Sequence, residues 1–156
     1  MGRVASSSLA LRTMEKTKQR PLVAVGVIIV KEGKILIGER LASHGAGTFS
    51  IPGGHFEFGK TFEEVARMEV REETGLTDIL FKRIVSVNNE RVYGKHYVNI
   101  GFLTEWKSGE PYAAEPEKSR NWKWYDPKEL PEPMFAPSKG IIDAWLSGKL
   151  INEITA

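Results

Sequence analysis

The sequence predicts an α+β fold, in which helices pack on both faces of a mixed β-sheet as an α/β/α sandwich. Three observations support it: strand-like runs come first, one well-capped helix follows in the middle, and further strands precede a terminal helix. A chain of 156 residues is also an ordinary length for one hydrophobic core. We therefore expect a single domain over residues 21–156.

The predicted sheet begins after Pro21. Residues 22–40, "LVAVGVIIVKEGKILIGER", hold two β-branched runs around Gly33, which predicts a hairpin. Further strands are expected over 77–90, 94–106 and 122–125, the first two joined by a turn near 92–94. Between them a loop over 42–49 leads to Pro52-Gly53-Gly54, a break that lets the backbone approach a bound group closely.

The central helix has clear signals at both ends. Thr61 with Glu64 has capping-box spacing, and Gly75 suits a left-handed C-cap, so we expect a helix over 62–74. Its predicted core stripe contains Phe62, Val65 and Ala66. A second helix follows the Pro-rich stretch near the end, with an apolar side formed by Ile141, Ile142, Trp145 and Leu146.

Composition and charge exclude several classes of protein. The chain has no cysteine, so disulfides, thiolate nucleophiles and zinc fingers are excluded, and we expect a cytoplasmic location. No apolar run approaches the ~20 residues of a membrane span, so no membrane partner is expected. Residues 1–20 hold five basic residues and one acidic residue, which leaves the rest of the chain slightly acidic, with a charge of −2. Without a basic stripe, a nucleic acid polymer is not expected as a partner.

The basic segment over residues 1–20 is expected to be a disordered leader. Its Ser and Arg content and its lack of acidic residues before Glu15 would also suit an organellar transit peptide.

The central helix also carries carboxylates where its core-facing side belongs. Glu69 and Glu73 lie within roughly 40° of each other on the side of Val65 and Ala66, and Glu72 lies at its edge. Turning two such charges inward costs several kcal/mol per uncompensated ion. Helix geometry leaves two answers open: local Arg or Lys partners with a tilt into solvent, or a hard divalent cation such as Mg²⁺.

Residues 53–76, "GGHFEFGKTFEEVARMEVREETGL", strongly resemble the Nudix box, G-x5-E-x7-R-E-U-x-E-E-x-G-U, where U is a bulky aliphatic residue. The matching positions are Gly54, Glu69, Val70, Glu72, Glu73, Gly75 and Leu76. The flanking stretches "GAGTF", "HYV" and "EPEKSRNWKWYDPKELP" are similar to MutT-type Nudix hydrolases of the human and plant nucleotide-sanitising subgroup. The resemblance implies a Nudix-type α/β/α sandwich and Mg²⁺-dependent hydrolysis of nucleoside triphosphates to a nucleoside monophosphate and pyrophosphate.

The resemblance also implies roles for single residues. Glu69, Glu73 and the Gly54 carbonyl would bind Mg²⁺, or Mn²⁺ in its place, and Glu72 would be a further ligand or an orienting group. Glu117, in the loop before Trp122, is the candidate that activates or orients water, although a loop carboxylate is more often simply solvated.

Two positions depart from the box: Lys60 replaces its first Glu, and Met68 replaces its Arg. Met68 cannot fix the box carboxylates as the Arg would, unless Arg67 or Arg71 takes over. Lys60 would repel a metal ion while being able to contact substrate phosphate. We expect weaker metal binding and slower turnover than a complete box would give.

The family's base pocket lies between the sheet and the loop after residue 130. Arg40 could reach phosphate or form a surface ion pair, and most of the aromatic candidates could equally be core residues. The candidates for substrate binding are Arg40, Phe49, Ser50, Gly53, His55, Lys60, Tyr97 and Phe135, with Trp124 and His96 as further ones.

Three functions compete. The first is the triphosphate hydrolase, the second an ADP-ribose or nucleotide-sugar pyrophosphatase, and the third a nucleotide-binding protein weakened in catalysis by Lys60 and Met68. All three imply a small nucleotide as partner. A homodimer would fit the family, but no exposed apolar stripe identifies an interface.

Overall fold

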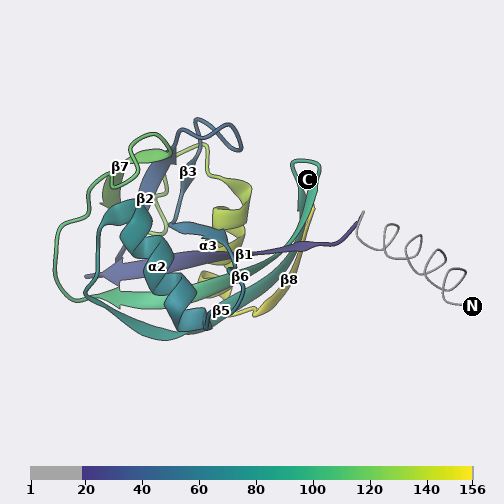
Figure 1. Ribbon diagram of the computed structural model, residues 1–156, viewed down its shortest axis with the longest axis horizontal. Helices are drawn as coiled ribbons and strands as arrows, with labels where there is room; N and C mark the ends of the chain where they lie inside the picture. Colours follow the sequence, from purple (N-terminus) through teal and green to yellow (C-terminus); the bar gives the residue numbers. More distant parts are fainter. Residues whose placement is uncertain (1–18, 156) are drawn as a thin grey trace, which may run out of the picture.

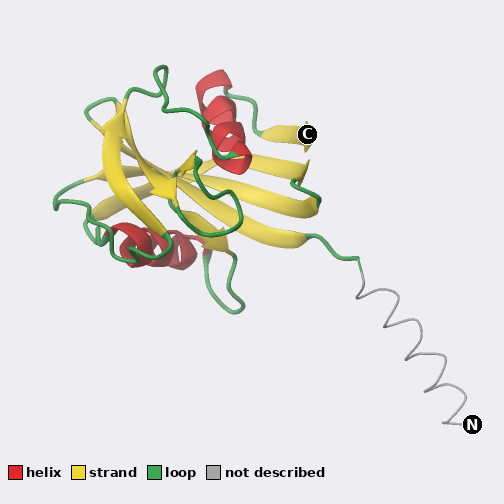
Figure 2. Ribbon diagram, turned by 90° about the horizontal axis from the view of Figure 1, so that it is seen from above, coloured by secondary structure: helices red, strands yellow, loops and turns green. Residues whose placement is uncertain are grey.

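In the computed structural model, which describes residues 19–155, an eight-stranded mixed sheet lies between helices α2 and α3 (Figures 1 and 2). This confirms the α+β arrangement predicted from the sequence. The predicted leader lies outside the described residues, apart from Gln19 and Arg20. No helix within residues 19–155 is long and apolar enough to cross a membrane.

The sheet has the order β3-β2-β1-β6-β5-β8, with β4 paired to β1 and β7 to β2. The pairs β1–β6 and β5–β8 are parallel, and the others are antiparallel. The strands are β1 (Leu22–Lys31), β2 (Lys34–Arg40), β3 (Phe49–Ser50), β4 (Gly53–His55), β5 (Ile79–Val92), β6 (Lys95–Trp106), β7 (Ser119–Tyr125) and β8 (Ile151–Thr155).

Both predicted turns join neighbouring strands. Glu32 and Gly33 connect β1 to β2 with φ of 51° and 79°, and Tyr93 and Gly94 connect β5 to β6 with φ of 54° and 69°. Two consecutive positive φ angles are the signature of the tight turn whose twist matches an antiparallel pair.

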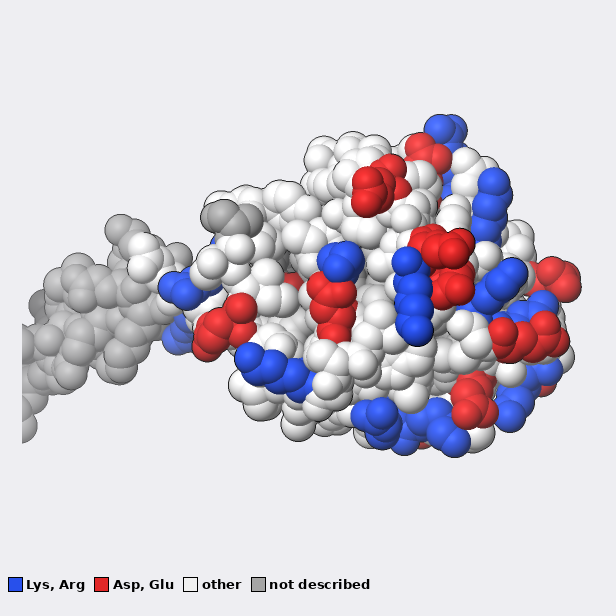
Figure 3. All heavy atoms as spheres, turned by 180° about the vertical axis from the view of Figure 1, so that it is seen from behind, with Lys and Arg blue, Asp and Glu red and all other residues white. Residues whose placement is uncertain are grey.

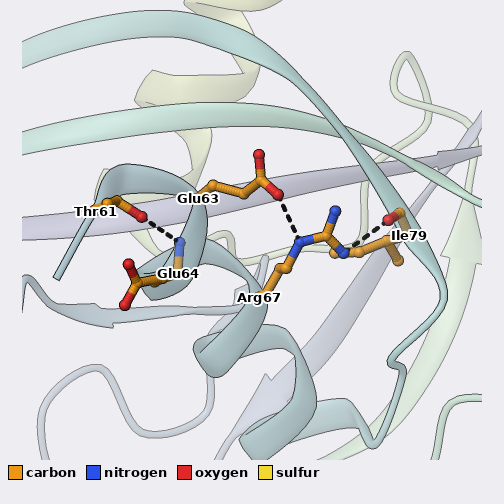
Figure 4. A network of polar contacts seen from close by, with 5 residues as sticks. All are labelled: Thr61, Glu63, Glu64, Arg67 and Ile79. Atoms are coloured by element: carbon orange, nitrogen blue, oxygen red, sulfur yellow. Dashed lines mark hydrogen bonds and ion pairs between the residues drawn. The ribbon is translucent and has the colours of Figure 1, made fainter.

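Helix α2 (Phe62–Thr74) has the predicted bounds. The Thr61 hydroxyl accepts a hydrogen bond from the Glu64 amide at 3.1 Å (Figure 4). Gly75 ends the helix with a φ of 74°. Val65, Ala66 and Val70 are buried against the sheet, together with Val25, Val27, Ile29, Leu36 and Phe102. Phe62 differs from the prediction: it is 43% exposed, and its ring packs edge-on against Phe56.

Helix α3 (Ala136–Ser147) covers the opposite face. Ile141 and Ile142 pack there with Ile28, Ile35, Ile37, Ile51 and Val85. The helix lies so close to β1 that a Cβ on Gly26 would come within 2.6 Å of the Ile141 Cδ1 atom. Leu146 is not on the buried side as predicted but is 47% exposed.

Four strands differ from the sequence expectations. The short strands β3 and β4 lie where a loop over 42–49 and a break at Pro52-Gly53-Gly54 were expected. Strand β7 starts at Ser119, three residues before the predicted start at Trp122, because Ser119 and Arg120 pair with Arg40 and Glu39 of β2. Strand β8 was not predicted. Its sequence "INEIT" is short and shows no core pattern, because most of the strand is exposed. The strand forms through parallel pairing with β5.

Candidate active site

Two carboxylates of α2 turn toward the glycines of β4. The Glu73 Oε2 atom accepts a hydrogen bond from the Gly53 amide at 2.8 Å. A Cβ placed on Gly54 would lie 2.6 Å from the Glu69 Oε1 atom, so a side chain at this position would displace the carboxylate. The break at Pro52-Gly53-Gly54 therefore does bring the backbone close to a functional group, and that group is a side chain of the helix.

Both carboxylates lie in surroundings that disfavour their charge. Burial, and then the neighbouring carboxylates of Glu72 and Glu115, raise the pKa of Glu69 to about 7. Burial is also the main reason why the pKa of Glu73 rises to about 8, and the charge of Glu69 adds to the effect. A cation between them would relieve both the desolvation and the repulsion.

The site fits a hard divalent cation that keeps part of its shell for water or phosphate. Its donors are carboxylate oxygens, the ligand type that Mg²⁺ and Mn²⁺ prefer. Within residues 19–155, no group of three or more His, Cys, Asp or Glu side chains forms a complete metal site. The protein would supply the two glutamates and a backbone oxygen. Mg²⁺ commonly binds proteins through so few ligands and completes its shell with water or substrate phosphate.

The arginines of α2 do not serve these carboxylates. The Arg67 Nε atom donates to Glu63 at 3.0 Å, and its Nη1 atom donates to the Ile79 carbonyl at 2.9 Å (Figure 4). Arg71 is exposed. Arg67 therefore does not orient the box carboxylates in place of the arginine that Met68 replaces.

Positive charge reaches the carboxylates from outside the helix instead. Arg40 of β2 lowers the pKa of Glu73, and Lys118, from the loop before β7, lowers that of Glu69, in each case against the larger effect of burial. The Lys118 Nζ atom lies 3.5 Å from the Glu115 Oε2 atom. Glu115 was missed from the sequence. It acts on both box carboxylates and is half-buried, whereas Glu117 is exposed.

A cavity of about 150 Å³ opens beside the carboxylates, on the α3 side of the sheet. Of the predicted substrate residues, Arg40, Gly53, His55, Tyr97 and Phe135 line it, together with Gly54. The lining residues that were missed include His44, Glu90, Tyr93 and Asn99. Alternating polar residues in an antiparallel strand usually face solvent, and only the packing of α3 reveals that Glu90 and Asn99 are buried.

Aromatic rings and one arginine build a wall of this cavity. The Arg40 guanidinium lies 3.9 Å from the centre of the Phe135 ring, and the Tyr93 ring stacks on Phe135 with centroids 5.6 Å apart. The Arg40 Nε and Nη2 atoms donate to the His44 carbonyl at 3.1 and 2.9 Å. The Tyr93 hydroxyl accepts from the Ala136 amide at 3.0 Å, so it also fixes the start of α3.

The remaining candidates lie elsewhere. Phe49 and Ser50 pair with β2 as strand β3, and Lys60 is exposed before α2, so none of the three lines the cavity. Trp124 packs edge-on against Trp106, and His96 contacts Asn89 at 2.6 Å. At the cavity mouth the rings of His55 and Tyr97 stack, with the His55 Nε2 atom 3.0 Å from the Tyr97 hydroxyl.

Comparison with known proteins identifies the family. The NUDIX domain model matches residues 20–146. An ADP-ribose pyrophosphatase of Methanocaldococcus jannaschii is 35% identical over 132 residues, which cover 82% of this chain and 76% of the relative. An oxidized purine nucleoside triphosphate hydrolase of Danio rerio is 31% identical over 106 residues, covering 67% and 66% of the two chains.

The solved structures agree. A MutT NUDIX hydrolase from Burkholderia pseudomallei superposes with a TM-score of 0.71 at 28% identity, over 81% of this chain and 98% of that chain. The glutamate pair on α2, the glycines of β4 and the matched family model lead to one conclusion: the chain belongs to the NUDIX domain family and is a Nudix hydrolase.

Proposed function

We propose that this chain hydrolyses nucleoside triphosphates to a nucleoside monophosphate and pyrophosphate, with Mg²⁺ bound by Glu69, Glu73 and the Gly54 carbonyl. Mn²⁺ would suit the same oxygen donors. One observation carries the proposal: Arg40 lies against the ring of Phe135 and also interacts with the charge of Glu73. Arg40 therefore lies between a cavity that suits a flat ring and a site that suits a metal ion and phosphate.

Each part of the site has a task in this reaction. A bound Mg²⁺ would supply charge neutralisation on the phosphates and lower the pKa of an attacking water. The Gly53 amide holds the Glu73 carboxylate at 2.8 Å in a fixed orientation. Arg40 would balance phosphate charge, and the wall formed by Phe135 and Tyr93 would hold the base.

A carboxylate of the loop before β7 would orient the attacking water or accept its proton. The sequence pointed to Glu117 for this role. We favour Glu115, since its charge acts on both Glu69 and Glu73 and its side chain is less exposed. Glu72 is exposed but close enough to raise the pKa of Glu69, which supports an orienting or additional metal-binding role.

The substrate would be a small nucleotide. On the face shown in Figure 3, acidic and basic side chains are interspersed and no continuous basic surface appears. Such a face offers little for the counterion release that drives the binding of nucleic acid polymers.

An ADP-ribose pyrophosphatase is the second candidate, because the archaeal relative carries that name at 35% identity. The two candidates share the metal site and differ in the group attached to the diphosphate.

The test is product analysis on a panel of unmodified and oxidised nucleoside triphosphates with ADP-ribose, in Mg²⁺ and in EDTA. We expect metal-dependent release of pyrophosphate from triphosphates. Turnover of ADP-ribose alone would move the assignment to the second candidate. Nucleotide binding without any turnover would identify a protein weakened in catalysis by Lys60 and Met68.

A further inference from the structure

One aromatic side chain of the cavity wall belongs to a residue whose backbone conformation its type disfavours. Tyr93 is the first of the two turn residues between β5 and β6, with a φ of 54°. A tight turn of this kind favours Asn, Asp or Gly at this position, because a bulky side chain is strained at positive φ. Burial does not explain the tyrosine either, since it is 46% exposed. Backbone strain gathers at functional sites, so the Tyr93 side chain needs a reason of its own.

The Tyr93 side chain fixes the residue at which α3 begins. Its hydroxyl accepts a hydrogen bond from the Ala136 amide at 3.0 Å. Phe135, the N-cap residue of α3, makes no side-chain cap, so the tyrosine supplies an acceptor that the helix's own sequence lacks. The Tyr93 ring also lies nearly parallel to the Phe135 ring, with 9° between their planes. Tyr93 therefore holds Phe135 through both the backbone and the ring.

Phe135 in turn holds Arg40. The Arg40 guanidinium carbon lies over the Phe135 ring, 3.9 Å from its centre. The Arg40 Nε and Nη2 atoms both donate to the carbonyl of His44, a neutral group. The His44 ring closes the cluster, because it packs edge-on against Tyr93 and Phe135 with centroids 5.3 and 5.5 Å apart. Neutral groups thus orient this guanidinium and leave its charge available to an anion.

The charge of Arg40 acts on the metal site. Burial lowers the pKa of Arg40, and the charge of Glu73 is the largest influence that opposes the lowering. Phosphates bound at a metal ion beside Glu73 would therefore lie within the influence of this guanidinium. Its orientation then decides how well a phosphate is held, because small misplacements of a binding group are expensive.

We propose that Tyr93 is a positioning residue: through Phe135 it holds the Arg40 guanidinium where that group can bind a phosphate of the substrate. The inference rests on the proposed function, in which Arg40 balances phosphate charge, and it is independent of the base that the nucleotide carries. Tyr93 would then affect the binding of phosphate without touching it. A role confined to stacking on the base would leave the binding of a phosphate without a base unchanged.

The first arm of the test measures the binding of inorganic pyrophosphate in Mg²⁺ by calorimetry, because this probe has no base. Tyr93→Leu, which removes the ring and the hydroxyl, should weaken binding by about fivefold or more, the scale of a lost cation–ring contact. Glu32→Leu places the same residue at the first position of the β1–β2 turn, where φ is 51°, and should keep the native affinity. Native affinity in folded Tyr93→Leu would overturn the proposal.

Tyr93→Phe is the milder variant, since it keeps the stacked ring and removes only the hydroxyl. Loss of the hydrogen bond to Ala136 loosens the start of α3, so pyrophosphate should bind at least about twofold more weakly than to the native protein. Native affinity in Tyr93→Phe would overturn the proposal even if Tyr93→Leu failed to fold.

The second arm asks whether Tyr93 acts through Arg40. Arg40→Gln should weaken pyrophosphate binding at least as much as Tyr93→Leu does, and adding Tyr93→Leu to Arg40→Gln should cause no further loss. A general disturbance of the cavity would instead weaken binding by the same factor in both backgrounds. Such independent losses would overturn the proposal.

Hydrolysis of triphosphates by the native protein, measured in parallel, separates this inference from the proposed function. Turnover combined with pyrophosphate binding that Tyr93→Leu leaves unchanged, or with no pyrophosphate binding at all, would reject the positioning role and leave the hydrolase standing. The expected pyrophosphate results without turnover of any triphosphate would reject the hydrolase and leave the positioning role standing. Absence of both turnover and pyrophosphate binding would reject both.

Discussion

At the scale of single residues, the site is a set of charges that the fold holds in unfavourable surroundings. Glu69 and Glu73 have raised pKa values and lie against the backbone glycines of β4. Stability alone would favour apolar residues at such positions. These carboxylates are therefore best explained by the ligands they would hold.

Two variants in the loop before β7 test which carboxylate assists the attacking water. Because Glu115 acts on both box carboxylates, Glu115→Gln should lower kcat by about 10²-fold or more, the usual contribution of a general base. Glu117→Gln, the matched change two residues away, should stay within about twofold of the native rate. Steady-state kinetics with saturating Mg²⁺ measure both, and the reverse order of effects would return the role to Glu117.

Glu90 also predicts how stability depends on pH. Its pKa is raised from 4.5 to about 7, so the unfolded chain holds fewer protons than the folded chain between these values. Stability from this group is therefore complete below pH 4.5 and is lost as the pH rises to about 7, by on the order of 3 kcal/mol.

Glu90→Gln removes this loss. In EDTA, urea unfolding should show that Glu90→Gln gains stability relative to the native protein as the pH rises from 5 to 8. Glu153→Gln should show no such trend. A stability difference that stays constant across this pH range would contradict a buried, titrating Glu90.

At the scale of elements, helix α2 was predictable because its end signals lie in its own sequence. The buried polar side chains of β5 and β6 beneath α3 were not. Helix α2 was placed correctly because Thr61 and Gly75 mark its ends within the sequence itself. Strand β8 depends on pairing with β5, and the burial of Asn88, Glu90 and Asn99 depends on α3 covering the sheet. Neither contact leaves a local pattern, since alternating polar residues in a strand usually face solvent.

The residues of the cavity were also predicted only in part. Arg40 was a candidate because it ends the second strand, His55 and Tyr97 lie in or beside the resembling stretches, and Phe135 lies in the loop after residue 130; all four line the cavity. Phe49 and Ser50 were included as candidates for the base pocket, but they pair with β2 in strand β3 and do not line the cavity. Sequence proximity to a motif thus did not decide which side chains face the ligand space.

Helix α2 carries a prediction about the two departures from the box. Arg67 is held by Glu63 and the Ile79 carbonyl and does not orient the box carboxylates, so an arginine at position 68 would supply a partner that α2 lacks. Met68→Arg with Lys60→Glu should raise kcat/KM several-fold through tighter Mg²⁺ binding. The measurement is activity as a function of Mg²⁺ concentration for each single variant and the double variant. An unchanged Mg²⁺ dependence in all three would show that Arg40 and Lys118 already balance the charge of the box carboxylates.

At the scale of the whole molecule, the layered fold brings two half-sites to one place. Helices α2 and α3 lie on opposite faces of the sheet (Figure 2). Helix α2 supplies the glutamates from its face, and α3 closes the cavity on the other. Strand β4, paired to β1, lies between them and contributes Gly53 to both. A nucleotide could then place its phosphates at the glutamates and its base in the cavity, with Arg40 between.

The most direct test of this account is Mg²⁺-dependent pyrophosphate release from GTP by Glu73→Gln, with the exposed Glu153→Gln as the matched control. We predict that Glu73→Gln loses at least about 10²-fold in kcat, because the amide lacks the charge that holds the metal ion, while Glu153→Gln keeps the native rate. Native turnover by a folded Glu73→Gln would contradict the metal site on which the whole account depends.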